Sequence, residues 1–210
     1  MEAAMARQRQ DSIRAPKQAR SQQRVDQILD AARDIVAARG SAALSIVDIA
    51  ESAGITAGSM YQYFPNKTAI LCALAERYLD EFGRRMAEKL AVIPQDYTSA
   101  MDTIDEIVEL FFQMNQQDPV MRDIMFGIVS DKSLRELSRR DSEAKIDALC
   151  AALVPVVPPA RRDDLRLSIL LMTEFVEAAV RAALDMPALE ARRTIDRLKA
   201  MIRAIWVAGI

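Results

Sequence analysis

Histidine is absent from this chain of 210 residues, and cysteine occurs only twice. Without histidine the chain lacks the commonest metal ligand and the commonest general base, so we expect no zinc site and no nucleophile–base pair. Cys72 and Cys150 each lie among apolar neighbours, which indicates two buried thiols rather than a disulfide. No phosphate-binding loop occurs either. The sequence therefore predicts neither an enzyme nor a cofactor.

Glycine and proline are also scarce, at 6 and 8 residues, and most of them fall where a helix would end. No stretch shows the apolar–polar alternation of a strand. Hydrophobic residues make up 51% of the chain, which is enough for a buried core. These features predict an all-α protein of about nine helices.

No apolar run approaches the roughly 20 residues that a membrane span needs. The N-terminus contains no apolar signal core. We therefore expect a cytoplasmic protein with no membrane partner.

The small net charge of −2 conceals an uneven distribution. Residues 1–24 contain six basic and two acidic residues, a charge of +4, which leaves −6 for the remainder. A basic arm before an acidic body suits phosphate contact at one end, whereas a solvated tail is the plainer interpretation. We expect residues 1–20 to be a mostly disordered arm.

Apolar residues at helical spacing predict one helix over residues 21–39 and a long one over residues 66–90. Five further helices are expected over residues 98–115, from 118 onward, 132–153, 160–184 and 187–208. The long helix is expected to contain the domain boundary. We place a DNA-binding domain in residues 21–68 and a larger helical domain in residues 69–210.

The segment from Ser45 to Lys67 indicates two short helices joined by a tight turn, followed by the start of a third. Ser45 is a good N-cap, and Gly54 can take the left-handed conformation that ends a helix. Thr56 offers a second N-cap, and its helix is short because Pro65 cannot continue it. A short helix held by a glycine-containing turn is the geometry that enters a DNA major groove.

Over roughly residues 20–75 the chain resembles the DNA-binding domain of the TetR family of transcriptional regulators. The residues that carry the resemblance are Ile28, Ala31, Ala32, Gly40, Ser45, Asp48, Ile49, Ala50, Ala53, Gly54, Gly58, Tyr61, Phe64, Lys67 and Leu71. The remainder is similar to the family in length, helicity and helix order. The resemblance implies an N-terminal helix-turn-helix domain, a C-terminal domain for effector binding and dimerisation, and repression rather than activation.

DNA contacts are expected from the first turn of the short helix and from residues around it. The candidates are Arg20, Arg24, Ser45, Thr56, Ala57, Gly58, Ser59, Tyr61, Gln62, Tyr63 and Lys67. By resemblance the two tyrosines contact phosphates, and the glutamine amide can read adenine. A tyrosine ring in the core is the competing interpretation for Tyr61.

Two of these residues are out of place in an ordinary helix. Gly58 costs about 1 kcal/mol against alanine in a helix interior, which a close approach of backbone to DNA would explain. Packing between helices is the alternative. Lys67 opposes the dipole at a helix start, by about 0.3–1 kcal/mol, unless a phosphate binds there. A plain surface lysine is the alternative.

The second half of the chain is rich in methionine and phenylalanine, which suit an adaptable apolar cavity. The candidates for a lipophilic effector site are Phe82, Met86, Met101, Phe111, Phe112, Met125, Phe126, Met172 and Phe175. A stripe of such residues is also what a plain core looks like. Glu174 and Glu177, within a very apolar helix, are either exposed edge residues or anchors for a cationic ligand.

The helix over residues 160–184 is apolar almost all round, so it needs a second buried surface. Pairing of the last two helices with their symmetry mates would provide one. The candidates are Leu171, Val180, Leu198, Met201, Ile202, Ile205 and Trp206. An ordinary monomer core is the alternative.

Together these features predict a homodimeric transcriptional regulator that binds a near-palindromic double-stranded DNA operator. We expect a repressor that a small lipophilic effector releases. The alternative is a helical ligand carrier or adaptor without DNA binding. An enzyme that uses the apolar pocket is remote, because no nucleophile has a base beside it.

Overall fold

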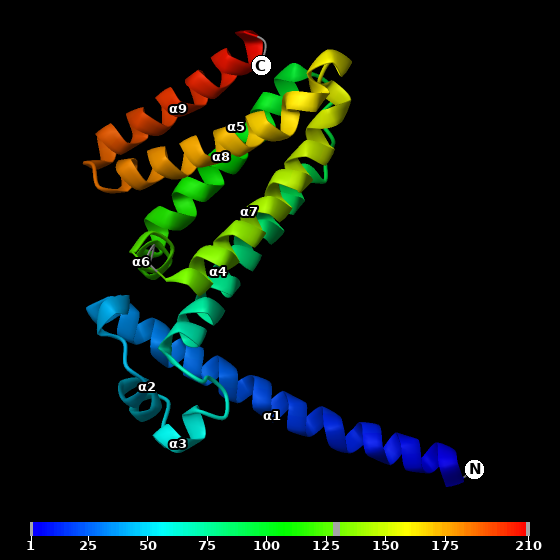
Figure 1. Ribbon diagram of the computed structural model, residues 1–210, viewed down its shortest axis with the longest axis vertical. Helices are drawn as coiled ribbons and strands as arrows, with labels where there is room; N and C mark the ends of the chain where they lie inside the picture. Colours follow the sequence, from blue (N-terminus) through cyan, green and yellow to red (C-terminus); the bar gives the residue numbers. More distant parts are fainter. Residues whose placement is uncertain (1, 128–130, 209–210) are drawn as a thin grey trace. The chain divides into compact units, whose positions relative to one another are not determined.

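The computed structural model describes residues 2–127 and 131–208, and of residues 2–18, 126, 127, 207 and 208 it describes only the backbone. The chain divides into two compact units, residues 1–74 and 75–210 (Figure 1). Throughout the described part, the structure contains nine α-helices, three short 3₁₀ turns and no strand. The all-α prediction is confirmed.

The first unit contains α1 (Glu2–Arg39), α2 (Ile46–Ser52), α3 (Ala57–Met60) and the start of α4 (Lys67–Leu90). Helix α1 begins at Glu2 and not near Ser21. Alanine, arginine and glutamine predominate there, and all are good helix formers.

The core of the first unit is small. Its buried side chains come from every helix of the unit: Ile28, Leu29, Ala32, Ile35, Val36, Ile49, Ala50, Met60, Phe64, Ile70, Leu71 and Leu74. Several of these are fully inaccessible, among them Ile28, Ile49 and Met60. This packing fixes α2 and α3 against α1.

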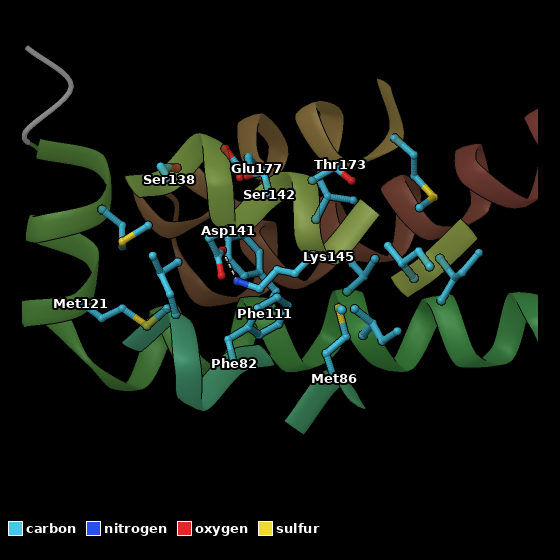
Figure 2. A pocket seen from close by; sticks show the side chains of 18 residues that line it. Phe82, Met86, Phe111, Met121, Ser138, Asp141, Ser142, Lys145, Thr173 and Glu177 are labelled. Carbon is cyan, nitrogen blue, oxygen red and sulfur yellow. Dashed lines mark hydrogen bonds and ion pairs between the residues drawn. The ribbon is translucent and has the colours of Figure 1, made fainter. Parts of the chain in front are cut away.

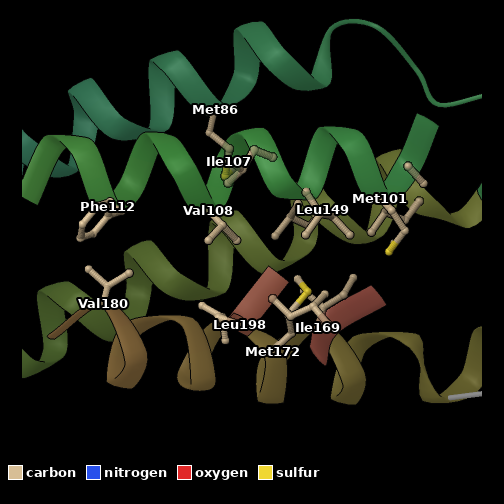
Figure 3. Packing of buried hydrophobic residues seen from close by; sticks show 14 of the residues in the cluster. Met86, Met101, Ile107, Val108, Phe112, Leu149, Ile169, Met172, Val180 and Leu198 are labelled. Atoms are coloured by element: carbon tan, nitrogen blue, oxygen red, sulfur yellow. The ribbon is translucent and has the colours of Figure 1, made fainter. Parts of the chain in front are cut away.

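The second unit contains the rest of α4 and five further helices: α5 (Tyr97–Gln117), α6 (Pro119–Gly127), α7 (Lys132–Leu153), α8 (Arg162–Leu184) and α9 (Ala188–Ala208). Its core joins side chains of α4, α5, α7, α8 and α9 into one cluster (Figure 3). Asp96 and Asp131 cap α5 and α7. The turns η2 (Val154–Val156) and η3 (Pro159–Arg161) connect α7 to α8.

Ion pairs link α9 to α5 in the second unit. Arg192 donates to both carboxylate oxygens of Glu109 at 2.8 Å, and Lys199 donates to the same carboxylate at 2.7 Å. Arg203 pairs with Asp105 at 2.7 Å. Across the described residues, no helix is long and apolar enough to cross a membrane.

Candidate functional site

Short-range hydrogen bonds build the turn between α2 and α3. The hydroxyl of Ser45 accepts from the Asp48 amide at 3.1 Å, and that of Thr56 accepts from the Ser59 amide at 3.1 Å. Between them Gly54 has φ +65, a left-handed conformation that glycine adopts without strain. The sequence predicted both caps and the glycine turn, and the structure confirms them.

Helix α3 places its polar side chains at the surface and its apolar ones in the core. Met60 is inaccessible and Phe64 is 7% exposed. Thr56, Gly58, Tyr61 and Gln62 are exposed, while Ala57, Ser59 and Tyr63 are half-buried. At 59% exposure, the Tyr61 side chain is not a core residue. The surface of α3 thus offers backbone, hydroxyl and amide groups to a partner.

Packing does not explain the glycine at position 58. A Cβ atom added to Gly58 would meet only the Thr56 hydroxyl oxygen, at 3.9 Å, which is ordinary contact. Its φ lies outside the left-handed region. Neither space nor backbone conformation therefore demands glycine at this position.

At the start of α4, Asn66 and Lys67 have different contacts. The Asn66 side chain accepts from the Ala69 amide at 2.9 Å and caps the helix. The Lys67 ammonium donates to the Ala42 carbonyl at 3.2 Å. Ala42 belongs to the turn η1 (Ser41–Ala43), just before the Ser45 cap. This contact holds the Lys67 side chain beside the N-terminal end of α2.

Arg20 and Arg24 lie within α1, where Arg20 is exposed and Arg24 is half-buried. The same helix forms one further side-chain contact that the sequence does not signal. Arg39 donates to the Asp48 carboxylate at 3.2 Å and links the end of α1 to α2. Nine residues separate these two side chains, so no local pattern signals the pair.

The second candidate site is a cavity of about 110 Å³ that lies wholly within residues 75–210 (Figure 2). Side chains of α4, α5, α6, α7 and α8 line it. Five of the predicted effector residues are among them: Phe82, Met86, Phe111, Met125 and Met172. The lining is mainly apolar, as small-molecule sites usually are.

Three other predicted effector residues lie elsewhere. Met101 and Phe112 are buried in the core and do not line the cavity. Phe175 is 58% exposed. A helix turns about 100° per residue, so Phe112 points away from Phe111 and Phe175 points away from Val176. The Phe126 side chain lies outside the described residues.

Two residues of α7 that line the cavity form an ion pair. The Lys145 ammonium pairs with the Asp141 carboxylate and lies 4.8 Å from the centroid of the Phe82 ring. The Phe82 and Phe111 rings meet edge to face, with centroids 5.3 Å apart. Burial raises the pKa of Asp141 and lowers that of Lys145, and their mutual hydrogen bond opposes both shifts.

Glu177 of α8 also lines the cavity, as do the hydroxyl-bearing residues Ser138, Ser142 and Thr173 (Figure 2). Burial raises the pKa of the Glu177 carboxyl group. Sequence analysis considered Glu177 but not the serines, Asp141 or Lys145. Asp141 and Lys145 are four residues apart, a spacing that usually marks an exposed helix pair.

The predicted dimerisation residues fall into two groups. Val180, Leu198 and Ile202 are buried within their own unit, so for these the monomer-core interpretation is the right one. Leu171, Met201 and Ile205 are exposed and Trp206 is half-buried. Phe175, expected in the effector site, lies with Leu171, Ile205 and Trp206 around a shallow hollow. We call Leu171, Phe175, Met201, Ile205 and Trp206 the α8–α9 apolar face.

Two family models match this chain. One is described as "Bacterial regulatory proteins, tetR family" and covers residues 28–74. The other is described as "Tetracyclin repressor-like, C-terminal domain" and covers residues 98–206. Together they include α2, α3 and most of the cavity lining.

Curated relatives match over only part of the chain. The "Fatty acid metabolism regulator protein" of Bacillus subtilis (strain 168) is 38% identical over 64 residues, or 30% of this chain and 33% of that protein. The "HTH-type transcriptional repressor KstR2" of Rhodococcus jostii (strain RHA1) is 37% identical over 59 residues, or 28% and 29%. This chain therefore spans about a third of the length of these relatives.

Solved structures share the fold over nearly the whole chain. A TetR-family transcriptional regulator from Streptomyces coelicolor has a TM-score of 0.66 at 24% identity, covering 89% of this chain and 99% of its own. FadR from Bacillus subtilis, in complex with stearoyl-CoA, has a TM-score of 0.63 at 20% identity, covering 88% and 98%. A SmeT–triclosan complex has a TM-score of 0.66 at 21% identity, covering 87% and 90%.

Proposed function

The chain belongs to the TetR family of DNA-binding transcriptional regulators, and from this premise we propose a homodimeric repressor that a small lipophilic effector releases from a near-palindromic operator. The observation that carries the proposal is the exposed surface of α3, with a glycine that neither packing nor φ requires. Such a surface suits close approach to DNA. Because its task is on DNA, we place the protein in the cytoplasm.

We propose that α3 enters the major groove and that groups around it hold the phosphates. Tyr61 and Gln62 are exposed and present a hydroxyl and an amide beyond the first turn of α3. Ser45, Lys67 and Arg24 supply hydroxyl and cationic groups from α2, α4 and α1. Phosphate contacts of this kind fix register, whereas base contacts fix sequence. The remaining proposed contacts are Arg20, Thr56, Ala57, Gly58, Ser59 and Tyr63.

We propose that two copies pair through the α8–α9 apolar face. Its exposed Leu171, Phe175 and Met201 form an apolar surface of the kind that monomers rarely leave uncovered. Two-fold pairing would set two recognition helices about 34–36 Å apart, or a multiple of that distance. Leu171→Glu, on α8, should give monomers in analytical sedimentation. Leu189→Glu, at an exposed leucine of α9 outside the α8–α9 apolar face, should leave the dimer intact.

The effector would act through α4. This helix begins at Lys67 beside α2 and carries Phe82 and Met86 into the cavity wall. A ligand that binds more tightly to a conformer whose two recognition helices have the wrong spacing for the operator would release DNA. The difference between the ligand's affinities for the two conformers is the whole driving force. The ligands in the FadR and SmeT complexes, stearoyl-CoA and triclosan, favour a lipophilic effector here.

The test is fluorescence anisotropy with genomic fragments over a range of salt concentrations. We expect binding that weakens steeply with salt, because cationic side chains displace counterions. Lys67→Ala should reduce the salt slope by about 1. Lys132→Ala, at the first residue of α7, is the matched control and should change nothing. Absence of salt-dependent binding at low ionic strength would favour a carrier or adaptor instead.

A further inference from the structure

The cavity in residues 75–210 is mainly apolar, so each ionisable group on its wall constrains what can bind there. Three such groups line it: Asp141, Lys145 and Glu177. Asp141 and Lys145 pair with each other, and the Lys145 ammonium also faces the Phe82 ring at 4.8 Å. These two charges are therefore already compensated within the protein.

Glu177 is not compensated in this way. It is half-buried on α8, and within the described part of the chain its carboxylate forms no hydrogen bond and no ion pair. Lys145 and Arg181 act on it only through longer-range electrostatics, and Glu174 opposes them. A carboxylate that loses water without gaining a partner costs free energy, and a bound cation would offset that cost.

The neighbouring charges favour the same sign of ligand. The groups that act on the three wall residues are Asp80 of α4, Asp141 and Lys145 of α7, and Glu174, Glu177 and Arg181 of α8. Four of these six are carboxyl groups. An anionic ligand would have to approach Glu177 and compete with Asp141 for Lys145, and a neutral ligand would leave Glu177 unpaired.

The apolar part of the wall suits an aromatic or alkyl body. The Phe82 and Phe111 rings lie edge to face, with centroids 5.3 Å apart, and such rings pack against an aromatic or alkyl group. Met86, Met121 and Met125 surround them with flexible, polarisable side chains. A dry cavity of about 150 Å³ holds benzene, so a cavity of about 110 Å³ suits a ligand of roughly one ring.

We propose that the effector of this cavity is a small lipophilic cation, with its cationic nitrogen beside Glu177 and its apolar body against Phe82 and Phe111. The inference rests on the proposed effector function of the cavity and specifies its ligand class. The Glu177 carboxylate then selects the charge of the ligand, and the aromatic rings and methionine side chains select its size.

Two probes of the same shape test the charge. N-methylpyridinium and toluene differ in having nitrogen or carbon at the ring position that carries the methyl group, so only the first is cationic. By calorimetric titration of the full chain, the cation should bind at least about tenfold more tightly. It should also weaken operator binding. Equal affinity, or tighter binding of the neutral probe, would overturn the inference and leave a lipophilic effector site in place.

Two variants of α8 assign the effect to one carboxylate. Glu177→Gln keeps the shape of the side chain and should weaken cation binding roughly tenfold while leaving the neutral probe unchanged. Glu174→Gln is the control, because this exposed carboxylate does not line the cavity. Equal losses from both variants, or no loss from Glu177→Gln, would contradict the proposal. If neither probe binds wild-type protein that still binds DNA, the proposal that this cavity is an effector site is wrong.

Discussion

In residues 45–67 the helix caps are hydrogen bonds between near neighbours, although Lys67 donates to Ala42, 25 residues before it. The cavity of residues 75–210 depends instead on segments far apart in the chain. The Ser45 and Thr56 caps each join residues three apart. In contrast, 83 residues separate Arg192 from Glu109 and 98 separate Arg203 from Asp105. The first surface is therefore a local structure, and the second is a product of helix packing.

The two regions also differ in what they expose. Around α3 the polar groups face outward and the unit keeps a small core beneath them. In the second unit, polar groups such as Asp141, Lys145 and Glu177 face inward around an apolar cavity. A surface that binds DNA tolerates polar exposure, but an inward-facing charge needs a partner. Local changes should thus affect DNA binding, and packing changes should affect the cavity.

The largest expected effect comes from removing a core side chain in either unit. Ile28→Ala and Ile195→Ala each empty a fully buried site and should cost about 2–5 kcal/mol of unfolding free energy. Ile28→Ala should also abolish DNA binding. The sole tryptophan, Trp206, lies in α9 and reports the second unit in urea denaturation. Circular dichroism reports both units.

If the units are independent, Ile28→Ala should leave the Trp206 transition in place, and Ile195→Ala should move it. Identical shifts of that transition by both variants would contradict the independence of the two units. They would mean that the two units unfold as one.

The next effect concerns the ion pairs between α5 and α9. Partial burial raises the pKa of Glu109, but hydrogen bonds from Lys199, Arg192 and Gln113 outweigh it and lower the pKa to about 2. Because the folded value lies below the ordinary 4.5, this stabilisation is present above about pH 4.5 and is lost as the pH falls toward 2. Glu109→Gln should cost about 1–2 kcal/mol at neutral pH.

The same variant should flatten the acid side of the stability profile that Trp206 fluorescence reports. Glu106→Gln is the control, because Glu106 pairs with Lys89 at an exposed site and should matter by less than about 0.5 kcal/mol. Equal losses from the two variants would mean that the partial burial of Glu109 adds nothing to the stability of the second unit.

This contrast also explains what the sequence could predict. The caps at Ser45 and Thr56 and the turn at Gly54 are decided by residues within a few positions, so their pattern is visible in the chain itself. The helix predicted over residues 132–153 matches the observed α7 (Lys132–Leu153) because Asp131 caps it. Five of the cavity residues were also among those predicted.

The rest depended on distant packing. Glu136–Arg140 and Asp141–Lys145 have the same spacing on α7, yet only the second pair lines the cavity. The side chains of Lys145 and Arg140 are 13% and 72% exposed, and what decides this is the helices that pack against each side of α7. In the same way, the sequence could not tell that Phe175 lies on the α8–α9 apolar face.

A smaller effect is expected from two glycine substitutions. Gly58→Ala and Gly83→Ala both have room for a Cβ atom, which would meet its nearest neighbour at 3.9 Å and 3.8 Å. Each should raise stability by about 0.5–1 kcal/mol, because alanine loses less conformational entropy on folding. Only Gly58→Ala should weaken operator binding in anisotropy titrations. Unimpaired binding by that variant would remove the argument for close backbone approach at α3.

An effect of similar size is expected from deleting one hydroxyl in each unit. Tyr61 is 59% exposed, and within the described part of the chain its hydroxyl forms no hydrogen bond to protein. Tyr61→Phe should therefore leave the melting temperature unchanged and weaken operator binding by about 0.5–1.5 kcal/mol. The Tyr97 hydroxyl donates to the Arg203 carbonyl at 2.7 Å, so Tyr97→Phe should lower stability and leave DNA affinity alone. Opposite results would mean that Tyr61 is structural, because a hydroxyl that only faces DNA cannot stabilise the free protein.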